Sequence, residues 1–258
     1  MIRIAHLSDP HFGTEKPHLV PQLLQALEAL APDVIVLSGD LTQRARSHQF
    51  AAAQGFIAAC PSPVLCIPGN HDMPLENFFA RLLHPFRAYH RAIGPDLAPV
   101  IDTPAALIAG VNTANPHVWK DGRITPAQLD RLARVFAHAG PRQRVVALHH
   151  PPVPPQGEPS SLTGASEAIT AFAAMGVDLV LSGHLHFSHA APLASAPRIL
   201  AVQAGTCLSN RTRQDGNAFT QIDLAPDSAV LTHHRAQTDG RFVPDAAMTF
   251  TRSAQGWA

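Results

Sequence analysis

The sequence predicts an α/β fold, and two observations carry that prediction. Short runs rich in Val, Ile and Leu alternate with segments whose apolar residues recur at helical spacing, a pattern typical of strand–helix units. Towards the end of the chain this alternation stops, and one strand-like run follows another. The length of 258 residues fits one domain or a compact pair and is sufficient to bury a large core.

The first half of the chain shows the alternation most regularly. Apolar β-branched runs predict strands at 2–7, 34–37 and 64–67, and helical spacing predicts helices at 19–30 and near 48–59. Residues 74–104 contain three arginines, four aromatic residues and several prolines, so we expect a helical insertion there, which could act as a cap.

The second half is less regular. Thr125-Pro126 is a typical helix start and predicts a helix at 125–137, between strands at 106–111 and 145–148. A proline-rich loop at 151–159 precedes a helix near 166–175 and a strand at 179–181. Three strand-like runs, at 198–202, 218–222 and 229–233, are expected to finish the fold.

The composition limits the class of partner. The chain has 19 Lys and Arg against 19 Asp and Glu, so it lacks the basic surface that duplex nucleic acid requires. It has no apolar stretch near the about 18 residues of a membrane span and no signal-peptide pattern. Three widely spaced cysteines argue against a disulfide framework and for a reducing, cytoplasmic compartment.

Five predicted strands end in residues of the kinds that bind metal ions. These motifs are Asp9-Pro-His11, Gly39-Asp40, Gly69-Asn70-His71-Asp72, His149-His150 and Gly183-His184-Leu-His186. Each alone is more often a turn or a surface pair than a ligand set. The carboxyl ends of strands in an α/β sheet line one crevice, however, so all five motifs in order predict a single metal site.

The donor types indicate which ions the site would take. Seven candidate ligands are too many for one four-coordinate ion, but they fit two ions if Asp40 bridges them. Imidazoles and carboxylates without a thiolate suit divalent Mn, Fe, Zn, Co or Ni better than Mg or Ca. The candidate ligands are Asp9, His11, Asp40, Asn70, His149, His184 and His186.

These motifs resemble the signature of the calcineurin-like metallophosphoesterases over residues 9–186. The signature reads Asp-x-His, Gly-Asp, Gly-Asn-His-Asp or Glu, His, and Gly-His-x-His, and this chain matches it without a missing ligand. The resemblance implies a four-layer αββα sandwich of two mixed β-sheets flanked by helices. The late strand-like runs agree with that fold, so we expect a single domain over 1–258 with its insertion at about 74–104.

The resemblance also implies a role for each site residue. Asp9, His11 and His186 would hold one ion, Asn70, His149 and His184 the other, and Asp40 would bridge them. His149 is preferred to His150 because the family's ligand lies two residues before the first proline. His71 would be a catalytic residue near the leaving group that binds no metal, with Asp72 as its orienting partner.

The expected activity is hydrolysis of a small phosphodiester. The Gly-Asn-His-Asp and His-His-Pro-Pro forms resemble small bacterial phosphodiesterases acting on cyclic nucleotides or glycerophosphodiesters, although Gln43 stands where many relatives carry an acidic residue. Two cations would activate the attacking hydroxide and neutralise phosphoryl charge. The alternatives are a polynucleotide nuclease of the same superfamily and a catalytically silent scaffold.

Four further residues are candidates for substrate binding. Arg44 lies four residues beyond Asp40, His117 lies in a loop after a predicted strand, and Arg211 and Arg213 lie in a turn-like stretch between late strands. The 74–104 segment is expected to form a rim over the pocket or a contact in a homo-oligomer. The sequence leaves open the physiological substrate, the native metals and the oligomeric state.

Overall fold

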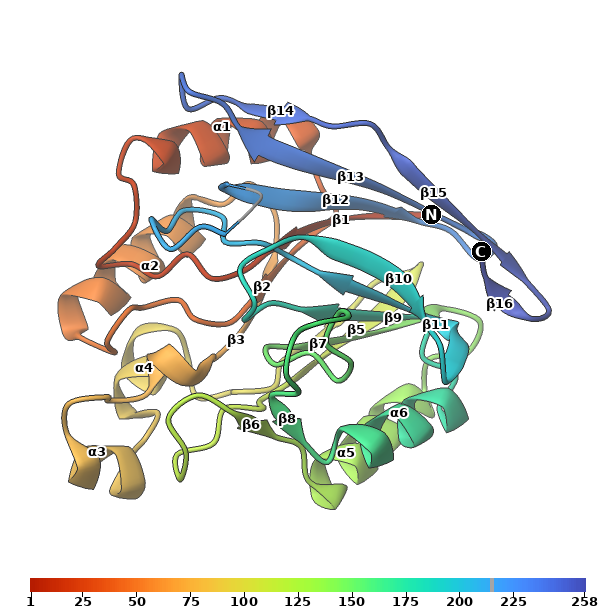
Figure 1. The fold of residues 1–258 in the computed structure, drawn as a ribbon, viewed down its shortest axis with the longest axis horizontal. Helices are drawn as coiled ribbons and strands as arrows, with labels where there is room; N and C mark the ends of the chain where they lie inside the picture. Colours follow the sequence, from red (N-terminus) through yellow and green to blue (C-terminus); the bar gives the residue numbers. More distant parts are fainter. Residues whose placement is uncertain (214–215) are drawn as a thin grey trace.

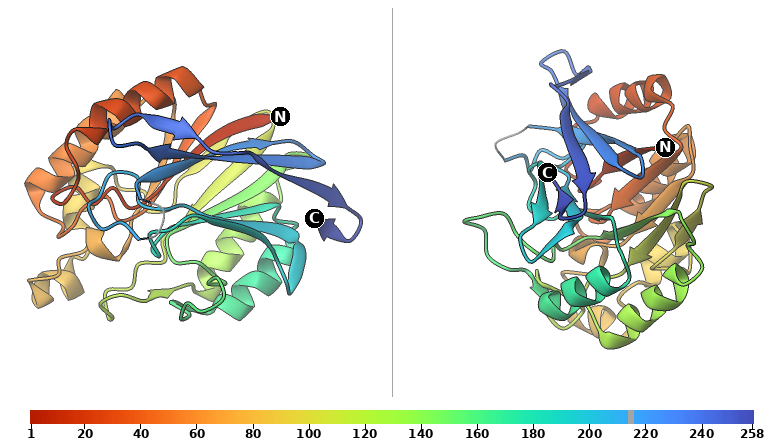
Figure 2. Two further views of the ribbon diagram at one scale, coloured as in Figure 1. Left: turned by 45° about the horizontal axis from the view of Figure 1, so that its top comes forward. Right: turned by 90° about the vertical axis from the view of Figure 1, so that its right-hand side faces the viewer.

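Two β-sheets pack face to face at the centre of the protein, and helices cover their outer faces (Figure 1). The structure is a computed structural model that describes residues 1–213 and 216–258. A view from the side shows the helix, sheet, sheet and helix layers in turn (Figure 2). The expected four-layer αββα sandwich is therefore confirmed.

The first sheet combines the start and the end of the chain. Its strand order is β16-β15-β13-β12-β1-β2-β3, with β14 pairing to β13. Strands β1, β2 and β3 are parallel, and β12 joins β1 in antiparallel register. Its strands are β1 (Ile2–Leu7), β2 (Val34–Ser38), β3 (Val64–Ile67), β12 (Ala218–Leu224), β13 (Ser228–Ala236), β14 (Phe242–Pro244), β15 (Met248–Ser253) and β16 (Gly256–Trp257).

The second sheet comes from the middle of the chain. Its order is β10-β11-β9-β7-β5-β4, with parallel pairing from β11 through β5 and antiparallel strands at both edges. Its strands are β4 (Val100–Asp102), β5 (Ala106–Val111), β7 (Gln143–Leu148), β9 (Leu179–Ser182), β10 (His189–Leu193) and β11 (Ala196–Gln203). A separate short ladder pairs β6 (Gly122–Arg123) with β8 (Leu162–Thr163).

Three apolar cores hold the layers together. The central core lies between the sheets and includes Ile4, Val36, Ile108 and Leu181, all fully buried. A second core packs α1 (Leu19–Leu30) and α2 (Ser47–Ala59) on the first sheet. The third packs α5 (Pro126–Phe136) and α6 (Ala165–Ala174) on the second sheet. Burial of this apolar area is the main force that fixes the two sheets against each other.

The 74–104 segment contributes both helices and a strand to the fold. It forms the expected helices, α3 (Phe78–Leu83) and α4 (Arg87–Ala92), but it also supplies edge strand β4. Tyr89 of α4 is fully buried and donates a hydrogen bond to the Cys66 carbonyl at 3.0 Å. The segment is therefore part of the core of the domain, and its deletion would expose apolar surface rather than simply open the pocket.

The prediction of the strands after residue 179 was incomplete. Strand β10 was missed, and β14, β15 and β16 follow the run that was expected to end the fold. These strands lie at or near sheet edges, and several of their side chains are exposed, so their apolar signal is weak.

The part of the chain that the structure describes contains no helix with the length and apolar character needed to span a bilayer.

Candidate metal centre

All seven predicted ligands lie where strands of the two sheets end on the same side. Asp9 and His11 follow β1, Asp40 follows β2, and Asn70 starts the single turn η1 (Asn70–Asp72) after β3. His149 follows β7, and His184 and His186 follow β9. Each of the seven is at most 9% exposed. Such burial of polar side chains requires compensating partners.

The first cluster consists of Asp9, His11, Asp40 and His186, with donor atoms within 4.8 Å of one another. Asp9 Oδ1 lies 3.5 Å from His11 Nε2 and 3.2 Å from His186 Nε2. The two Nε2 atoms lie 3.2 Å apart. Asp9 Oδ1 is buried without a hydrogen-bond partner, which is the arrangement expected for an atom that binds a cation.

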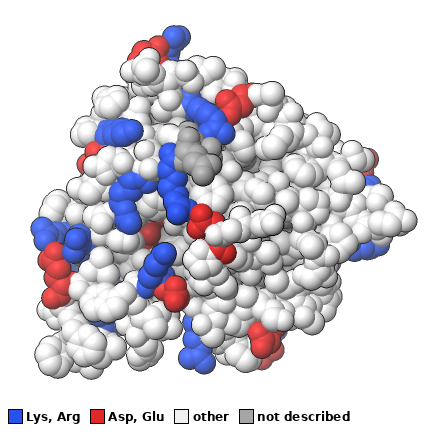
Figure 3. All heavy atoms as spheres, in the orientation of Figure 1, with Lys and Arg blue, Asp and Glu red and all other residues white. Residues whose placement is uncertain are grey.

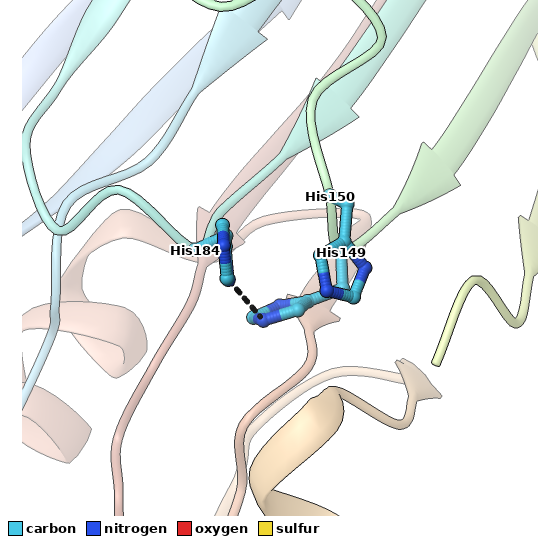
Figure 4. A group of neighbouring side chains, drawn as sticks. All are labelled: His149, His150 and His184. Carbon is cyan, nitrogen blue, oxygen red and sulfur yellow. Dashed lines mark hydrogen bonds between the residues drawn. The ribbon is translucent and has the colours of Figure 1, made fainter. Parts of the chain in front are cut away.

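The second cluster consists of the remaining predicted ligands, Asn70, His149 and His184, and lies beside the first. His149 Nε2 is 3.3 Å from His184 Nδ1, and Figure 4 shows the two rings turned towards each other. The Asn70 amide oxygen is also buried without a hydrogen-bond partner, and Asn70 lines the same cleft as His184. Asp40 Oδ2 lies 3.4 Å from His149 Nε2 and 3.6 Å from His11 Nε2. Asp40 is therefore positioned between the clusters, as a bridging ligand must be.

The structure distinguishes His149 from His150, whose rings are neighbours in Figure 4. Both ring nitrogens of His150 have protein partners, because Nδ1 lies 2.8 Å from Thr113 Oγ1 and Nε2 lies 2.9 Å from the Lys120 carbonyl. His149 instead has its Nε2 directed at Asp40 and His184. The donor atoms of His149, His150 and His184 all lie within 4.8 Å of one another, so the choice of His149 as the ligand stays a prediction.

Backbone carbonyls fix the tautomers of two imidazoles. His149 Nδ1 donates to the Ser38 carbonyl at 2.8 Å, and His186 Nδ1 donates to the Arg211 carbonyl at 2.7 Å. A carbonyl can only accept, so the hydrogen lies on Nδ1 and the lone pair lies on Nε2, which faces the cluster. Imidazoles that bind metals in proteins usually donate their second nitrogen in this way.

The backbone at the ligands adopts an unusual conformation. Seven non-glycine residues of the described chain have positive φ, and five of them are predicted ligands: Asp9, His11, Asp40, His184 and His186. Side chains disfavour the left-handed region, and residues held there cluster at functional sites. The strand ends therefore turn sharply to direct these side chains at one centre.

The glycines before the ligands permit close approach. A Cβ on Gly69 would lie 2.2 Å from Asp40 Oδ1, and one on Gly183 would lie 1.8 Å from Ser8 Oγ and 2.5 Å from Asp9 Oδ2. The contacted atoms belong to buried residues that have little space to move. These two glycines are thus required by the packing of the ligand carboxylates.

The electrostatics favour cation binding. Burial opposes ionisation of Asp9 and Asp40, but the surrounding imidazoles outweigh it and hold the pKa of each carboxyl well below its usual range. Burial likewise opposes a charge on His149, yet Asp40 and Asp9 raise its pKa to about 9. Burial and the neighbouring His149 lower the pKa of His184 to about 3. Carboxylates and imidazoles fit two divalent transition-metal ions, and the raised pKa of His149 means that this imidazole must lose a proton when a metal binds.

The predicted partnership of His71 with Asp72 is wrong. The Asp72 carboxylate instead accepts hydrogen bonds from the amides of Gly69, Leu41 and Thr42 and from the Thr42 hydroxyl, at 2.8–3.1 Å. His71 Nδ1 donates to the Gln43 carbonyl at 2.8 Å, and its Nε2 lies 3.1 Å from Arg211 Nη1. Asp72 therefore fixes the turns around Asp40, while Gln43 orients the His71 ring.

A cleft of about 680 Å³ opens over the ligands. Arg211 and Arg213 line it, whereas Arg44 and His117 do not. Substrate binding by any of the four stays a prediction. The Arg44 guanidinium pairs with Glu76 at 3.4 Å on the surface, the His117 amide hydrogen-bonds to Asn115 in an exposed turn, and neither residue is in the cleft lining.

Sequence reasoning did not single out six residues that line the cleft: Leu75, Trp119, Lys120, Glu158, Leu185 and Thr212. Trp119 had a usable signal, since a large aromatic side chain in a polar loop after a strand is unlikely to belong to a core. Leu75 comes from the 74–104 segment, which thus contributes directly to the rim.

Curated proteins with similar sequences are named as phosphodiesterases. A cAMP/cGMP dual specificity phosphodiesterase of Mycobacterium tuberculosis is 25% identical, over 93% of this chain and 82% of its own length. The 3′,5′-cyclic adenosine monophosphate phosphodiesterase CpdA of Escherichia coli is 27% identical, over 95% and 94%. The glycerophosphodiester phosphodiesterase GpdQ of Enterobacter lignolyticus is 27% identical over 58% of this chain and 57% of its own length.

Solved structures of low sequence identity share this fold. A dimetal phosphatase from Danio rerio superposes with a TM-score of 0.71 at 14% identity, covering 98% of this chain and 99% of its own. A purple acid phosphatase from yellow lupin gives 0.71 at 14% identity, covering 98% of this chain and 54% of its own. The family model for calcineurin-like phosphoesterases matches residues 2–188, which include every predicted ligand. This chain belongs to the calcineurin-like phosphoesterase family.

Proposed function

We propose that this protein hydrolyses a small phosphodiester, of the cyclic nucleotide or glycerophosphodiester type, at a centre of two divalent transition-metal ions. The observation that carries the proposal is the position of Asp40, whose carboxylate lies within 3.6 Å of imidazole nitrogens from both clusters. The names of the relatives from M. tuberculosis, E. coli and E. lignolyticus support the diester as substrate class.

The proposed ligand roles are those that the family resemblance implies. Asp9, His11 and His186 would hold one ion, Asn70, His149 and His184 the other, and Asp40 both. A pair of such ions lowers the pKa of a bound water and neutralises charge on the phosphoryl oxygens. Mn, Fe, Zn and Co all fit these donors, so the identity of the ions stays open.

His71 is positioned to hold a proton for the leaving group. Its Nδ1 hydrogen is committed to the Gln43 carbonyl, so Nε2 is the atom at which a proton can be taken up or released. Nε2 accepts a hydrogen bond from Arg211 Nη1 at 3.1 Å, so this bond must open before Nε2 can take up a proton, and both residues line the cleft. A leaving alkoxide needs a proton, and positioned groups of this kind contribute typically about 10²–10⁴-fold in rate.

The charged side chains around the cleft suit an anionic substrate of limited size. Lys120, Arg211 and Arg213 lie in its lining, and Glu158 is engaged by Arg213 at 2.8 Å. The formal net charge of zero over the whole chain argues against a polynucleotide, since nucleic-acid binding depends on neutralising many phosphates.

Three further properties stay predictions: limitation of substrate size by the 74–104 segment, homo-oligomer formation and a cytoplasmic location. The free thiols of Cys60, Cys66 and Cys207 support a reducing compartment.

A hydrolysis panel tests the proposal. The Mn²⁺-loaded protein would be assayed with bis-p-nitrophenyl phosphate, p-nitrophenyl phosphate, 2′,3′- and 3′,5′-cyclic nucleotides, glycerophosphodiesters and single-stranded DNA. We expect one of the small diesters to be the best substrate. Faster cleavage of DNA would favour the nuclease, and two bound ions without hydrolysis of any ester would favour the silent scaffold. His149→Ala is the control, because it should retain the fold and lose one ion.

A further inference from the structure

One wall of the cleft is formed by the loop between β5 and β6. Trp119 and Lys120 of this loop line the cleft together with Asn70 and His71. Trp119 is 57% exposed, whereas the other tryptophan of the chain, Trp257, is only 4% exposed. Exposure of more than half of so large an apolar ring in a cleft beside a metal centre indicates a role in binding.

Arg81 of α3 fixes the position of this loop. Although it is 2% exposed, its guanidinium donates only to main-chain carbonyls, at 3.0 Å to Pro116 and 3.4 Å to Asn115, with further bonds to Val118 and Pro74. The same guanidinium lies over the Trp119 ring, 5.1 Å from its centroid. A buried charge is retained only when its donors are satisfied, so Arg81 ties the loop firmly to the 74–104 segment.

His150 fastens the two ends of the loop to the metal centre. Its ring lies between Thr113 Oγ1 at 2.8 Å and the Lys120 carbonyl at 2.9 Å. His150 follows the ligand His149 directly, so the position of Trp119 is linked to that of the second cluster. An aromatic surface held in advance binds its ligand with a smaller loss of conformational entropy.

The charges near the ring decide which group it would bind. Arg81 covers one face of Trp119, and Lys120, Arg211 and Arg213 lie in the same cleft lining. In Figure 3, Lys and Arg side chains gather in the left half of this face, over the loops that follow the strands, while the right half is almost without charge. This environment disfavours a cationic group such as choline. It favours an uncharged aromatic group attached to a phosphate.

We infer that Trp119 is a specificity-determining residue that stacks on the nucleobase of a cyclic nucleotide while the phosphate lies over the metal centre. This inference rests on the proposed function and narrows it, because a glycerophosphodiester offers no ring to stack. Base stacking on an aromatic side chain tolerates every base, so selection would be for a nucleotide rather than for one particular base.

Kinetics with a matched pair of substrates test the inference. The pair is 3′,5′-cyclic AMP and the 3′,5′-cyclic phosphate of methyl riboside, which lacks only the base. Trp119→Ala should lower kcat/KM for cyclic AMP by roughly 5- to 100-fold and leave the baseless diester within about twofold, whereas Trp119→Phe should retain most of the preference. Val118→Ala, an exposed position on the same loop, is the control and should change neither substrate.

Binding gives a second reading that does not require turnover. With Zn²⁺ in both sites, AMP should quench the fluorescence of Trp119, whereas ribose 5-phosphate should not. Trp119→Phe should abolish the quenching by AMP, because the other tryptophan, Trp257, is buried. Equal losses for both substrates in Trp119→Ala, or no quenching by AMP, would overturn the inference while leaving a phosphodiesterase of another substrate intact. If the wild type cleaves no diester, the proposed function fails, and the quenching experiment still decides whether Trp119 binds a base.

Discussion

Replacement of Asp40 by Asn tests whether one carboxylate serves both ions. The substitution keeps the shape of the side chain and an oxygen to accept from the His71 amide, which donates to Asp40 Oδ1 at 2.8 Å. It removes a unit charge that lies 3.4–3.6 Å from nitrogens of both clusters. Two unit charges at about 4 Å interact by about 4 kcal/mol at an effective dielectric constant of about 20, which corresponds to about 10³-fold in affinity.

The two ions should respond unequally to this change. The first cluster keeps the Asp9 carboxylate, whereas the ligands proposed for the second ion, Asn70, His149 and His184, include no carboxylate of their own. We therefore expect the ion of the second cluster to be lost first, and the content to fall from two ions to one or fewer per chain. Elemental analysis after dialysis and calorimetric titration of metal-free protein with Zn²⁺ measure this. Asp102→Asn, which removes an exposed carboxylate paired with Arg142, is the control for net charge. Two ions bound with unchanged affinity would refute the bridging role.

Three further predictions concern the histidines. His71→Ala should keep both ions and lose roughly 10²–10⁴-fold in rate with alkyl diesters but less with p-nitrophenyl diesters; equal losses would assign it to phosphate positioning. His149→Ala should lose one ion, whereas His150→Ala should keep two by elemental analysis, and the reverse result would exchange their roles. Metal affinity should rise about tenfold per pH unit up to about pH 9. Asp40 and Asp9 outweigh burial and raise the pKa of His149 to about 9, and this imidazole must lose its proton to bind a metal. A calorimetric affinity that is independent of pH from 6 to 9 would contradict this.

The ligands could be predicted from the sequence because each follows a strand with a strong apolar signal. Short motifs such as Gly39-Asp40 acquire meaning only from their place at a strand end, and β1, β2, β3, β7 and β9 were all expected close to where they lie. Edge strands such as β10 have half-exposed faces, so periodicity alone does not show them.

Contacts made by main-chain groups could not be predicted from the sequence. The partner of His71 is the carbonyl of Gln43, and a carbonyl is present at every residue, whereas the expectation of Asp72 came only from the family resemblance. The same holds for Arg81, whose partners are all carbonyls of residues chosen by the path of the loop. Such contacts require the fold to be known.

The geometry of the metal centre also depends on how the two sheets are placed relative to each other. Asp9, His11, Asp40 and Asn70 come from the first sheet, and His149, His184 and His186 from the second, so each cluster draws donors from both. The distance between donors across this boundary is set by the packing of side chains such as Ile4 and Ile108 in the central core. A well-packed interior transmits small changes of volume. Metal affinity in this protein is therefore a property of its hydrophobic interior as much as of its ligands, and sequence change far from the cleft can retune which ions it retains.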